Sequence, residues 1–283
     1  MTINKFNNLF FLLLLNLTFF SCNKPIKDTY IPGWNLIWQD EFNYPKEKLA
    51  KNWTFEKGYG SNGWGNDEWQ YYTNENTSIE SGNLVITAKA EGNINKRDKS
   101  VTSSRLQTYQ KFDFKPGTKI IARIKLPWGQ GIWPAFWALG SNYSEVGWPS
   151  CGEIDILEMT GASPIDHEKN YTIHSTCHWN DVNDPKNYKH AQHGKPLKLD
   201  KEFINDYHVY EMIYQSDYIE TKVDGKEIFK IKTNVGKLKE PFSKAFFLIL
   251  NVAVGGHWPG NPSNETIFPQ KMHVDYIRAY QKT

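Results

Sequence analysis

Three acidic side chains, Glu153, Asp155 and Glu158, stand within six residues of one another and are separated by large apolar residues. The alternation and the β-branched residues predict a strand. Side chains two apart share one face of a strand, so Glu153 and Asp155 point the same way. Regular pleating would place Leu157 next on that face and Glu158 on the other. We therefore predict a β-bulge around Ile156-Leu157 that returns Glu158 to the carboxylate face.

Acids gathered on one face repel one another, and a catalytic site can use that repulsion. A retaining glycosidase needs two carboxyl groups roughly 5–5.5 Å apart, one as nucleophile and one as acid/base. A third acid between them can share a proton with the nucleophile and separate the pKa values. The same motif would also suit a solvated acidic face on an edge strand, or a metal site, and by itself it does not separate these readings.

Short alternating runs recur along the chain and are separated by Gly, Asn, Pro and Asp, whereas long amphipathic helical patterns are absent. Examples are residues 83–88, 119–124 and 206–212. Residues 219–223 and 226–231 flank Asp224-Gly225, which predicts a β-hairpin. This pattern predicts an all-β fold, an antiparallel β-sandwich.

The carboxylate run and its neighbours resemble glycoside hydrolase family 16 and, within it, the laminarinase-like endo-β-1,3-glucanases. The extra residue between Asp155 and Glu158 is similar to the bulged branch of that family. The pieces that carry the resemblance span most of the chain: WQDEF at 38–42, NDEWQYYT at 66–73, SR at 104–105, ARIKLP at 122–127, GQGIWPAFW at 129–137, NVAVGG at 251–256 and VDYIR at 274–278.

The resemblance implies a jelly roll with a concave substrate cleft and endo-acting hydrolysis of β-1,3-glucan with retention of configuration. Glu153 would be the nucleophile, Glu158 the acid/base and Asp155 the residue that orients and tunes Glu153. A polysaccharide would be the partner, and catalysis would need no cofactor. Mixed-linkage β-glucan or a red-algal galactan (agarase- or porphyranase-like activity) remains an alternative substrate, and a non-catalytic glycan-binding lipoprotein remains an alternative class.

Two polar residues outside the carboxylate strand are implied to bind sugar. Asn66 lies in a Gly/Asn-rich loop, and the resemblance places it near the cleavage point, although loop residues are often simply solvated. Arg105 would reach the cleft, where its fork of donors suits sugar hydroxyls. A surface charge is the alternative for Arg105.

Tryptophan, tyrosine and phenylalanine make up 15% of the chain, so some rings fill the core and others can serve as platforms for sugar rings. The resemblance implies that Trp133 and Trp137 contact substrate, with Trp133 at the cleft and Trp137 further along its floor. We also place Trp258 on a sugar face. Trp128 and Trp148 are weaker candidates that could serve packing alone.

Two histidines follow the carboxylate strand on its expected antiparallel neighbour. We expect His174 to lie beside the catalytic face in a supporting role and include it among the substrate-binding residues; a strand histidine is more often a structural hydrogen-bonding residue. The role of His178 stays open. The HExxH and Cys/His spacings of zinc sites are missing.

The chain begins with a targeting segment. Lys5 precedes an apolar run from Leu9 to Phe20, too short to cross a membrane as a helix, and Ser21-Cys22 follows. We predict a lipoprotein signal peptide at 1–21, a lipidated Cys22 with a tether at 22–33, and a glycoside hydrolase catalytic domain at 34–283. The protein would be an exported bacterial outer membrane lipoprotein, at the cell surface or the periplasmic face, anchored to the membrane by its N-terminal lipid. Cleavage by the ordinary signal peptidase would make it secreted instead.

Lipidation of Cys22 would leave Cys151 and Cys177 as a pair. A strand register summing near 328 would bring them opposite each other, and export permits a disulfide. Two buried free thiols are the alternative.

Charge and family likeness complete the expectations. The formal net charge is +2 and no basic stripe is present, which argues against a nucleic-acid partner. We expect a monomer. The resemblance also implies a structural Ca²⁺ held by Glu41, the carbonyl of Gly82 and Asp275, oxygen ligands of the kind that calcium takes. Carboxylates that only cap strand ends are the alternative there.

Overall fold

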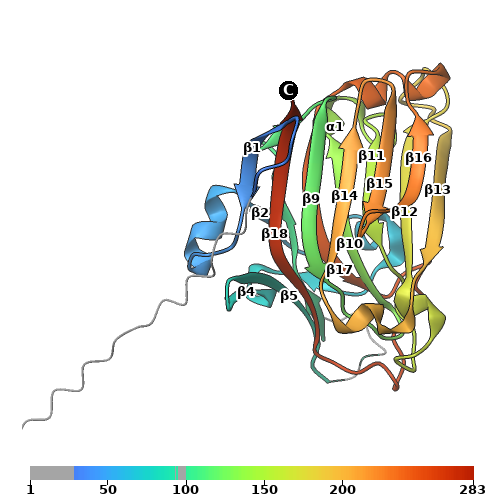
Figure 1. Cartoon of the computed structure of the whole chain (residues 1–283). Helices are drawn as coiled ribbons and strands as arrows, with labels where there is room; N and C mark the ends of the chain where they lie inside the picture. Colours follow the sequence, from blue (N-terminus) through green and yellow to red (C-terminus); the bar gives the residue numbers. More distant parts are fainter. Residues whose placement is uncertain (1–28, 93, 95–99) are drawn as a thin grey trace, which may run out of the picture.

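The computed structural model describes residues 29–92, 94 and 100–283, so the predicted signal peptide and Cys22 lie outside the described residues. Strands are the dominant regular element of this part of the chain and form two sheets (Figure 1). The larger sheet has ten strands, in the order β16 (Lys226–Lys232), β15 (Tyr218–Val223), β14 (His208–Tyr214), β9 (Thr118–Lys125), β18 (Gln270–Lys282), β5 (Asn83–Ala90), β6 (Val101–Ser103) and β3 (Tyr71–Tyr72), with β1 (Trp34–Asp40) beside β18 and β4 (Thr77–Glu80) beside β5.

The second sheet has eight strands among the described residues. Their order is β13 (His190–Lys198), β12 (Thr172–Asn180), β11 (Glu153–Glu158), β10 (Ile132–Gly140), β17 (Phe246–Val254), β7 (Arg105–Gln107) and β2 (Thr54–Glu56), with β8 (Asp113–Phe114) beside β17. The remaining elements are short: α1 (Tyr143–Val146), a π-type turn η2 (Gly63–Asp67), and the 3-10 helices η1 (Lys46–Lys51), η3 (Asn74–Asn76), η4 (Glu168–Tyr171), η5 (Lys201–Asn205), η6 (Gly236–Leu238) and η7 (Pro241–Ser243).

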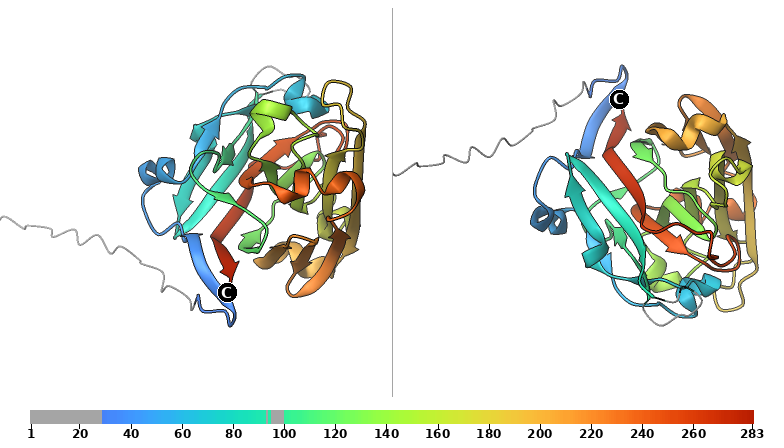
Figure 2. Two further views of the ribbon diagram at one scale, coloured as in Figure 1. Left: turned by 90° about the horizontal axis from the view of Figure 1, so that it is seen from above. Right: turned by 90° about the horizontal axis from the view of Figure 1, so that it is seen from below.

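The predicted antiparallel sandwich is confirmed. Every pair of named strands runs antiparallel except β3 with β6, which pair through two residues each. The predicted hairpin is β15–β16, with Asp224 and Gly225 at positive φ in its turn. The end-on views show β1 alongside the C-terminal end of β18 (Figure 2). None of the helices in the described part of the chain is both long enough and apolar enough to span a bilayer.

The main core lies between the two sheets because alternate residues of each strand point inward. Ile154 and Leu250 of the eight-stranded sheet belong to the same buried cluster as Ile120 and Met212 of the ten-stranded sheet. Burying each such side chain stabilises the fold by about 1.5–3 kcal/mol relative to leaving it exposed. The other face of the eight-stranded sheet points away from this core and is therefore available for a functional site.

The expected disulfide between Cys151 and Cys177 is wrong, because both are buried free thiols. In the observed register Ile154 lies opposite Cys177, so the residue numbers of a pair sum to 331 rather than 328. The two sulfur atoms also belong to different clusters: Cys177 packs in the main core, whereas Cys151 packs with Leu139 and Phe247. Burial raises the pKa of both thiols, which disfavours the thiolate needed for oxidation.

Candidate active site

The predicted bulge in β11 is confirmed. Along β10 the pairing steps from Phe136–Leu157 directly to Trp137–Asp155, which leaves Ile156 as the extra residue. Ile156 and Leu157 both enter the core. The bulge thereby places the three acids opposite every second residue of each neighbouring strand, and hence on one face: Glu153, Asp155 and Glu158 lie opposite His178, Thr176 and His174 on β12, and opposite Leu139, Trp137 and Ala135 on β10.

A hydrogen-bond chain through the core supports the bulge. The carbonyl of Asp155 accepts a 2.6 Å bond from the hydroxyl of Ser175, a β12 residue that lies between the two registers. Thr221 on β15 of the other sheet donates to the Ser175 hydroxyl at 2.8 Å. A bulge interrupts the ladder and frees a backbone group, and Ser175 satisfies it inside the core.

The carboxylate face forms part of a cleft of about 950 Å³ on the outer face of the eight-stranded sheet. Acids, aromatic rings and amides line it together: Ser61, Trp64, Gly65, Asn66, Glu68, Arg105, Trp133, Ala135, Trp137, Leu139, Tyr143, Trp148, Glu153, Asp155, Glu158, Thr176, His178, His190, Gln192, Asn251 and Trp258. A volume and a lining of this kind are typical of small-molecule and oligosaccharide sites. A solvated acidic face on an edge strand is excluded, since β11 lies between β10 and β12.

Each of the two outer acids accepts a hydrogen bond from an indole. Trp148 Nε1 donates to Glu153 Oε2 at 3.1 Å, and Trp133 Nε1 donates to Glu158 Oε1 at 3.1 Å. Glu153 is partly accessible, whereas Glu158 is buried. The two carboxyl groups therefore have different surroundings.

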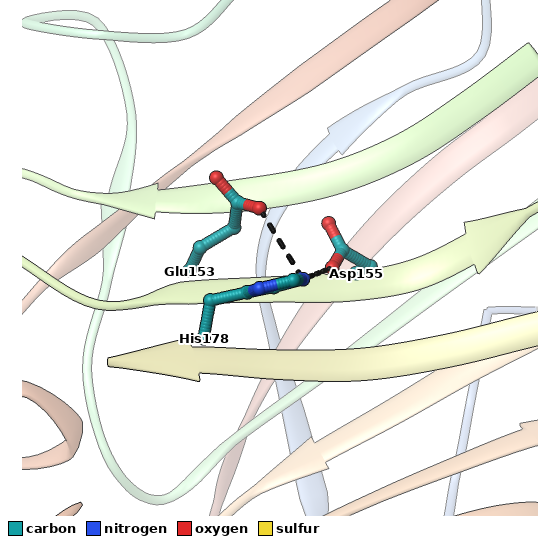
Figure 3. Close-up of side chains that lie close together, drawn as sticks. All are labelled: Glu153, Asp155 and His178. Carbon is teal, nitrogen blue, oxygen red and sulfur yellow. Dashed lines mark ion pairs between the residues drawn. The ribbon is translucent and has the colours of Figure 1, made fainter. Parts of the chain in front are cut away.

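His178 lies against the first two acids. Its Nε2 is 3.0 Å from Asp155 Oδ2 and 3.7 Å from Glu153 Oε1 (Figure 3). Ligating atoms of these three residues all lie within 4.8 Å of one another, so the cluster has the residue types of a metal site as well as of a catalytic site. It is the only such group found among the described residues.

Burial raises the pKa of all three acids because it penalises the charged form. It raises the pKa of Glu153 to about 8, with repulsion from Asp155 as the second cause and attraction by His178 and Arg105 as opposing causes. Burial also raises the pKa of Asp155. The pKa of Glu158 is raised well above its usual range by burial and then by the charges of Asp155 and Glu153. Glu158 is thus the acid best suited to keep a proton near neutral pH.

These raised pKa values predict that the three acids lower the stability of the folded protein once the pH is high enough to ionise them. A carboxyl whose pKa rises on folding contributes stability below its unfolded pKa, and that stability is lost as the pH rises through the folded pKa. For Glu153, this stability is lost between about pH 4.5 and about pH 8. Glu153→Gln should therefore melt a few degrees above the wild type at pH 8, since about 1 kcal/mol shifts Tm by about 2–4 °C in a chain of this size. At pH 4 the wild type and Glu153→Gln should have the same Tm. A Tm difference that shrinks as the pH rises would contradict this expectation.

Asn66 is placed in the cleft beside an acid that the sequence analysis did not single out. Asn66 Nδ2 donates to Glu68 Oε1 at 3.1 Å, while Gln70 Nε2 at 2.6 Å and the Tyr72 hydroxyl at 3.3 Å donate to Oε2. Burial raises the pKa of Glu68. Asn251 Nδ2 in turn donates to the Tyr72 hydroxyl at 3.2 Å. This network fixes the Asn66 side chain from below.

The Asn66 loop is also held by a close backbone approach. His257 N donates to Asn66 O at 2.9 Å, and a Cβ added to Gly256 would come within 2.8 Å of that same oxygen. Gly256 has φ +116°, a conformation that side chains rarely adopt. The Gly255-Gly256 pair therefore lets the two loops meet.

Arg105 faces the cleft but is already engaged. Its guanidinium carbon lies 4.7 Å from the centre of the Trp64 ring and 4.9 Å from that of Trp137, and its Nε pairs with Glu56. Trp137 Nε1 donates to Asn251 Oδ1 at 2.8 Å. Cation–π contact and the ion pair hold Arg105 and orient Trp137 at the same time.

The remaining predicted rings gather near Glu158. Trp258 is 42% exposed and meets Trp133 edge to face at 5.3 Å. His174 is not among the residues that line the cleft; it packs on Trp258 at 5.0 Å. Trp148, rated a weak candidate, lines the cleft and contacts Glu153.

Sequence reasoning missed the roles of Glu68, Asn251, His190 and Trp64 in the cleft. For His178 a signal existed. It stands four residues from His174 on one strand, and so on the same face as the residue opposite Glu158. No such signal existed for His190, because this residue lies on a strand of mixed polarity whose pairing depends on the fold.

The topology places the three residues expected to hold calcium on or beside adjacent strands of the ten-stranded sheet. Glu41 follows β1, whose last pair is Asp40 with Ile277, and Asp275 lies where the β18 register shifts. Gly82 is in the β4–β5 turn, beyond the pair of Leu84 with Val274. Two carboxylates and a carbonyl are a donor set that suits calcium. Arg278 pairs with Glu41 at 2.6 Å and Arg123 with Asp275 at 2.7 Å, so a cation there would share both acids with arginines.

Comparison with known proteins assigns the family. Residues 65–278 match the family described as glycosyl hydrolases family 16. The structure of endo-β-1,3-glucanase from Pyrococcus furiosus superposes with a TM-score of 0.74 and 43% identity, covering 88% of this chain and 95% of that one. The curated beta-glucanase of Rhodothermus marinus is 33% identical across 88% of this chain and 86% of its own length.

A third relative is longer. The glucan endo-1,3-beta-glucosidase A1 of Niallia circulans is 35% identical across 90% of this chain, which spans only 39% of that protein's length. The family match at residues 65–278 contains the bulged strand β11 and all three acids. With the family match covering most of the chain, the conclusion is that this protein is a glycoside hydrolase and belongs to glycosyl hydrolases family 16.

Proposed function

We propose that this protein is an endo-acting β-1,3-glucanase that hydrolyses laminarin-like glucan with retention of configuration. The observation that carries the proposal is the bulged strand, which sets Glu153, Asp155 and Glu158 on one face of a cleft of glucan-binding size. The relatives whose names refer to β-1,3-glucan cleavage support the substrate class. The whole activity is a proposal about this chain.

In the first half of the reaction, an ionised Glu153 attacks the anomeric carbon while Glu158 gives its proton to the departing glycosidic oxygen. The pKa of Glu158 is raised well above its usual range, which keeps that proton available. His178, Arg105 and the Trp148 N–H favour the ionised form of Glu153. In the second half, Glu158 removes a proton from water, which attacks the glycosyl-enzyme and releases Glu153.

Asp155 tunes the pair. It lies between the two glutamates on the same face and raises the pKa of both by its charge. A proton held by Asp155 while Glu153 is ionised keeps the adjacent pair at one negative charge; once sugar esterifies Glu153, that group is neutral and its ester carbonyl can accept a hydrogen bond from the protonated Asp155. Asp155 thereby avoids two adjacent buried charges at each stage.

The charge of the cleft favours a neutral polysaccharide. Among the described residues that line it, Arg105 is the only permanently cationic side chain, and Glu56 already pairs with it. A sulfated galactan would need free cations to replace its lost hydration. Exposed rings such as Trp258 and Trp148 instead offer flat apolar faces to unsulfated sugar.

Product analysis on laminarin, mixed-linkage glucan and agarose tests the proposal. Short β-1,3-linked oligosaccharides should appear from laminarin, and Glu153→Gln should produce none. Cleavage of agarose alone would keep the mechanism and replace the substrate. Glucan binding without cleavage by the wild type would favour the non-catalytic binding protein.

Export and lipid anchoring remain proposals that rest on the sequence of residues 1–22. Expression of the whole chain in a bacterium with labelled palmitate should label the mature protein at Cys22, and Cys22→Ser should release it in soluble form. Label that persists in Cys22→Ser would contradict the assignment. The monomeric state is likewise a proposal, for which gel filtration with light scattering is the measurement.

The calcium proposal gives a stability prediction. A cation that binds only the folded state adds RT ln(1 + [L]/Kd), about 2.7 kcal/mol at a hundredfold excess over Kd. Millimolar Ca²⁺ should therefore raise Tm by several degrees over an EDTA-treated sample, and Asp275→Asn should abolish the rise. An equal rise in wild type and Asp275→Asn would place calcium elsewhere, for instance at Glu153, Asp155 and His178.

A further inference from the structure

We propose that His190 is a positioning residue for hydrolysis, acting through His178 to hold the Nε2 edge of that ring against Asp155 and Glu153. The kinetic part of this inference rests on the proposed function. Its structural part concerns the orientation and protonation of His178 and can be measured without substrate.

His178 lies between the catalytic acids and His190. Nε2 of His178 faces Asp155 at 3.0 Å and Glu153 at 3.7 Å. On the opposite edge of the ring, Nδ1 of His178 is 2.9 Å from Nε2 of His190. The two rings also stack, with centres 5.1 Å apart and planes 17° from parallel. Among the described residues of the cleft, His190 alone hydrogen-bonds to Nδ1, so it is placed to set which edge of His178 turns toward the acids.

His190 stands behind both groups that contact Glu153 from this side. Its ring centre is 4.8 Å from that of Trp148, whose Nε1 donates to Glu153 Oε2. His190 is the first residue of β13 and lies opposite Asn180 in the ladder with β12. One residue of the neighbouring strand thus supports the indole and the imidazole that both approach Glu153.

The short distance between the two ring nitrogens limits their protonation. Two nitrogens 2.9 Å apart share one proton, so one ring donates and the other accepts. Burial lowers the pKa of His190, and so does His178, which favours a neutral His190 that can accept. A protonated His178 can then donate from Nδ1 to His190 while its Nε2–H faces the carboxylates.

The charged groups around His178 define the expected pH effect. Glu153 and Asp155 face it from β11, Glu158 acts on it from further along that strand, and Arg105 adds a positive charge near Glu153. Hydrogen bonds to an ionised group are stronger than those between neutral groups. Loss of the His190 acceptor should therefore weaken the attraction by His178 that helps Glu153 ionise, and move the acidic limb of kcat/KM to higher pH.

Three variants test this. His190→Phe keeps a ring beside Trp148 and His178 but removes the nitrogen, whereas His190→Gln offers an amide at a similar reach. His193→Phe is the matched control: it lies on the same strand, but its ring packs on Phe229 and it is not among the cleft-lining residues. We expect His190→Phe to lower kcat about tenfold, with a smaller change in KM, and to shift the acidic limb upward by roughly half a pH unit. His190→Gln should restore most of both, and His193→Phe should match the wild type.

The ¹⁵N chemical shifts of the histidine side chains give the readout that needs no substrate. In the wild type, the shifts of His178 should report a proton on Nε2 and a proton on Nδ1 that is donated to His190; in His190→Phe they should report a lower occupancy of the Nδ1 proton. An unchanged occupancy of that proton with an unchanged pH profile would overturn the proposal even if kcat fell. A wild type that cleaves no glucan would overturn the proposed function instead, while the shifts would still decide the role of His190.

Discussion

Glu153→Gln is expected to lose about 10⁵-fold in kcat on laminarin, the order of loss that follows removal of a covalent nucleophile. The amide is nearly isosteric and can still accept from Trp148, so the cleft should keep its shape. It cannot form the glycosyl-enzyme. Laminarin binding, measured by calorimetry, should remain within a fewfold of the wild type, which would separate lost chemistry from lost affinity.

A smaller variant identifies the configuration as well as the residue. Glu153→Gly leaves space beside the anomeric carbon, so azide can enter from the nucleophile's side and yield an α-glycosyl azide from an activated β-glucoside. The wild type should release product that is initially β, as seen by proton NMR. An initial α product from the wild type, or substantial activity in Glu153→Gln, would sink the retaining assignment. The higher Tm expected for Glu153→Gln at pH 8 guards against misfolding as the cause of its inactivity.

Glu158→Gln is expected to lose about 10²–10⁴-fold on laminarin, the usual contribution of a positioned acid or base. The loss should depend on the leaving group, because an aryl glucoside with an acidic phenol needs no proton to depart. Glycosyl-enzyme should then accumulate, since water attacks slowly without a base. Azide needs no base, so it should restore turnover and give a β-glycosyl azide.

The contrast between the two azide products assigns the two glutamates. If Glu158→Gln lost equal activity on laminarin and on the aryl glucoside, and azide had no effect, Glu158 would be a positioning group. Trp133→Phe is a matched control. It removes the indole N–H donated to Glu158 and shortens the ring that meets Trp258, and the N–H donation favours the ionised form of Glu158. This variant should therefore raise the pKa of Glu158 further and extend the basic limb of the pH profile to higher pH.

The sequence alone was sufficient for features that depend on neighbouring residues. Alternation along residues 153–158 specified which acids share a face, and the spacing of Glu158 required a bulge, because side chains on a strand repeat every two residues. The β15–β16 hairpin followed from Asp224-Gly225 for the same local reason. The family likeness added the fold and the cleft, which strand patterns by themselves left open.

Pairing between strands was decided by the tertiary structure. In the observed register the numbers of two paired residues sum to 331 rather than 328. This separates Cys151 from Cys177 and places their side chains in different clusters. The reason is that register depends on how whole sheets close around a shared core, and a small shift changes every opposing pair. Arg105 shows the same limit. The resemblance implied that Arg105 reaches the cleft, which it lines, but only the fold revealed its partners: Trp64 and Trp137 on its faces and Glu56 at its Nε.

The electrostatics of the site also arose only on folding. In the sequence, Glu153, Asp155 and Glu158 are ordinary carboxylates, and His178 and His190 are two histidines twelve residues apart. Burial on the outer face of the sheet raises the pKa of the acids, and the β12–β13 pairing brings the two imidazoles together. The residue types and the shared face were thus local properties of the chain. The protonation of those residues and their supporting partners depend on desolvation and on contacts between distant segments, which exist only in the folded protein.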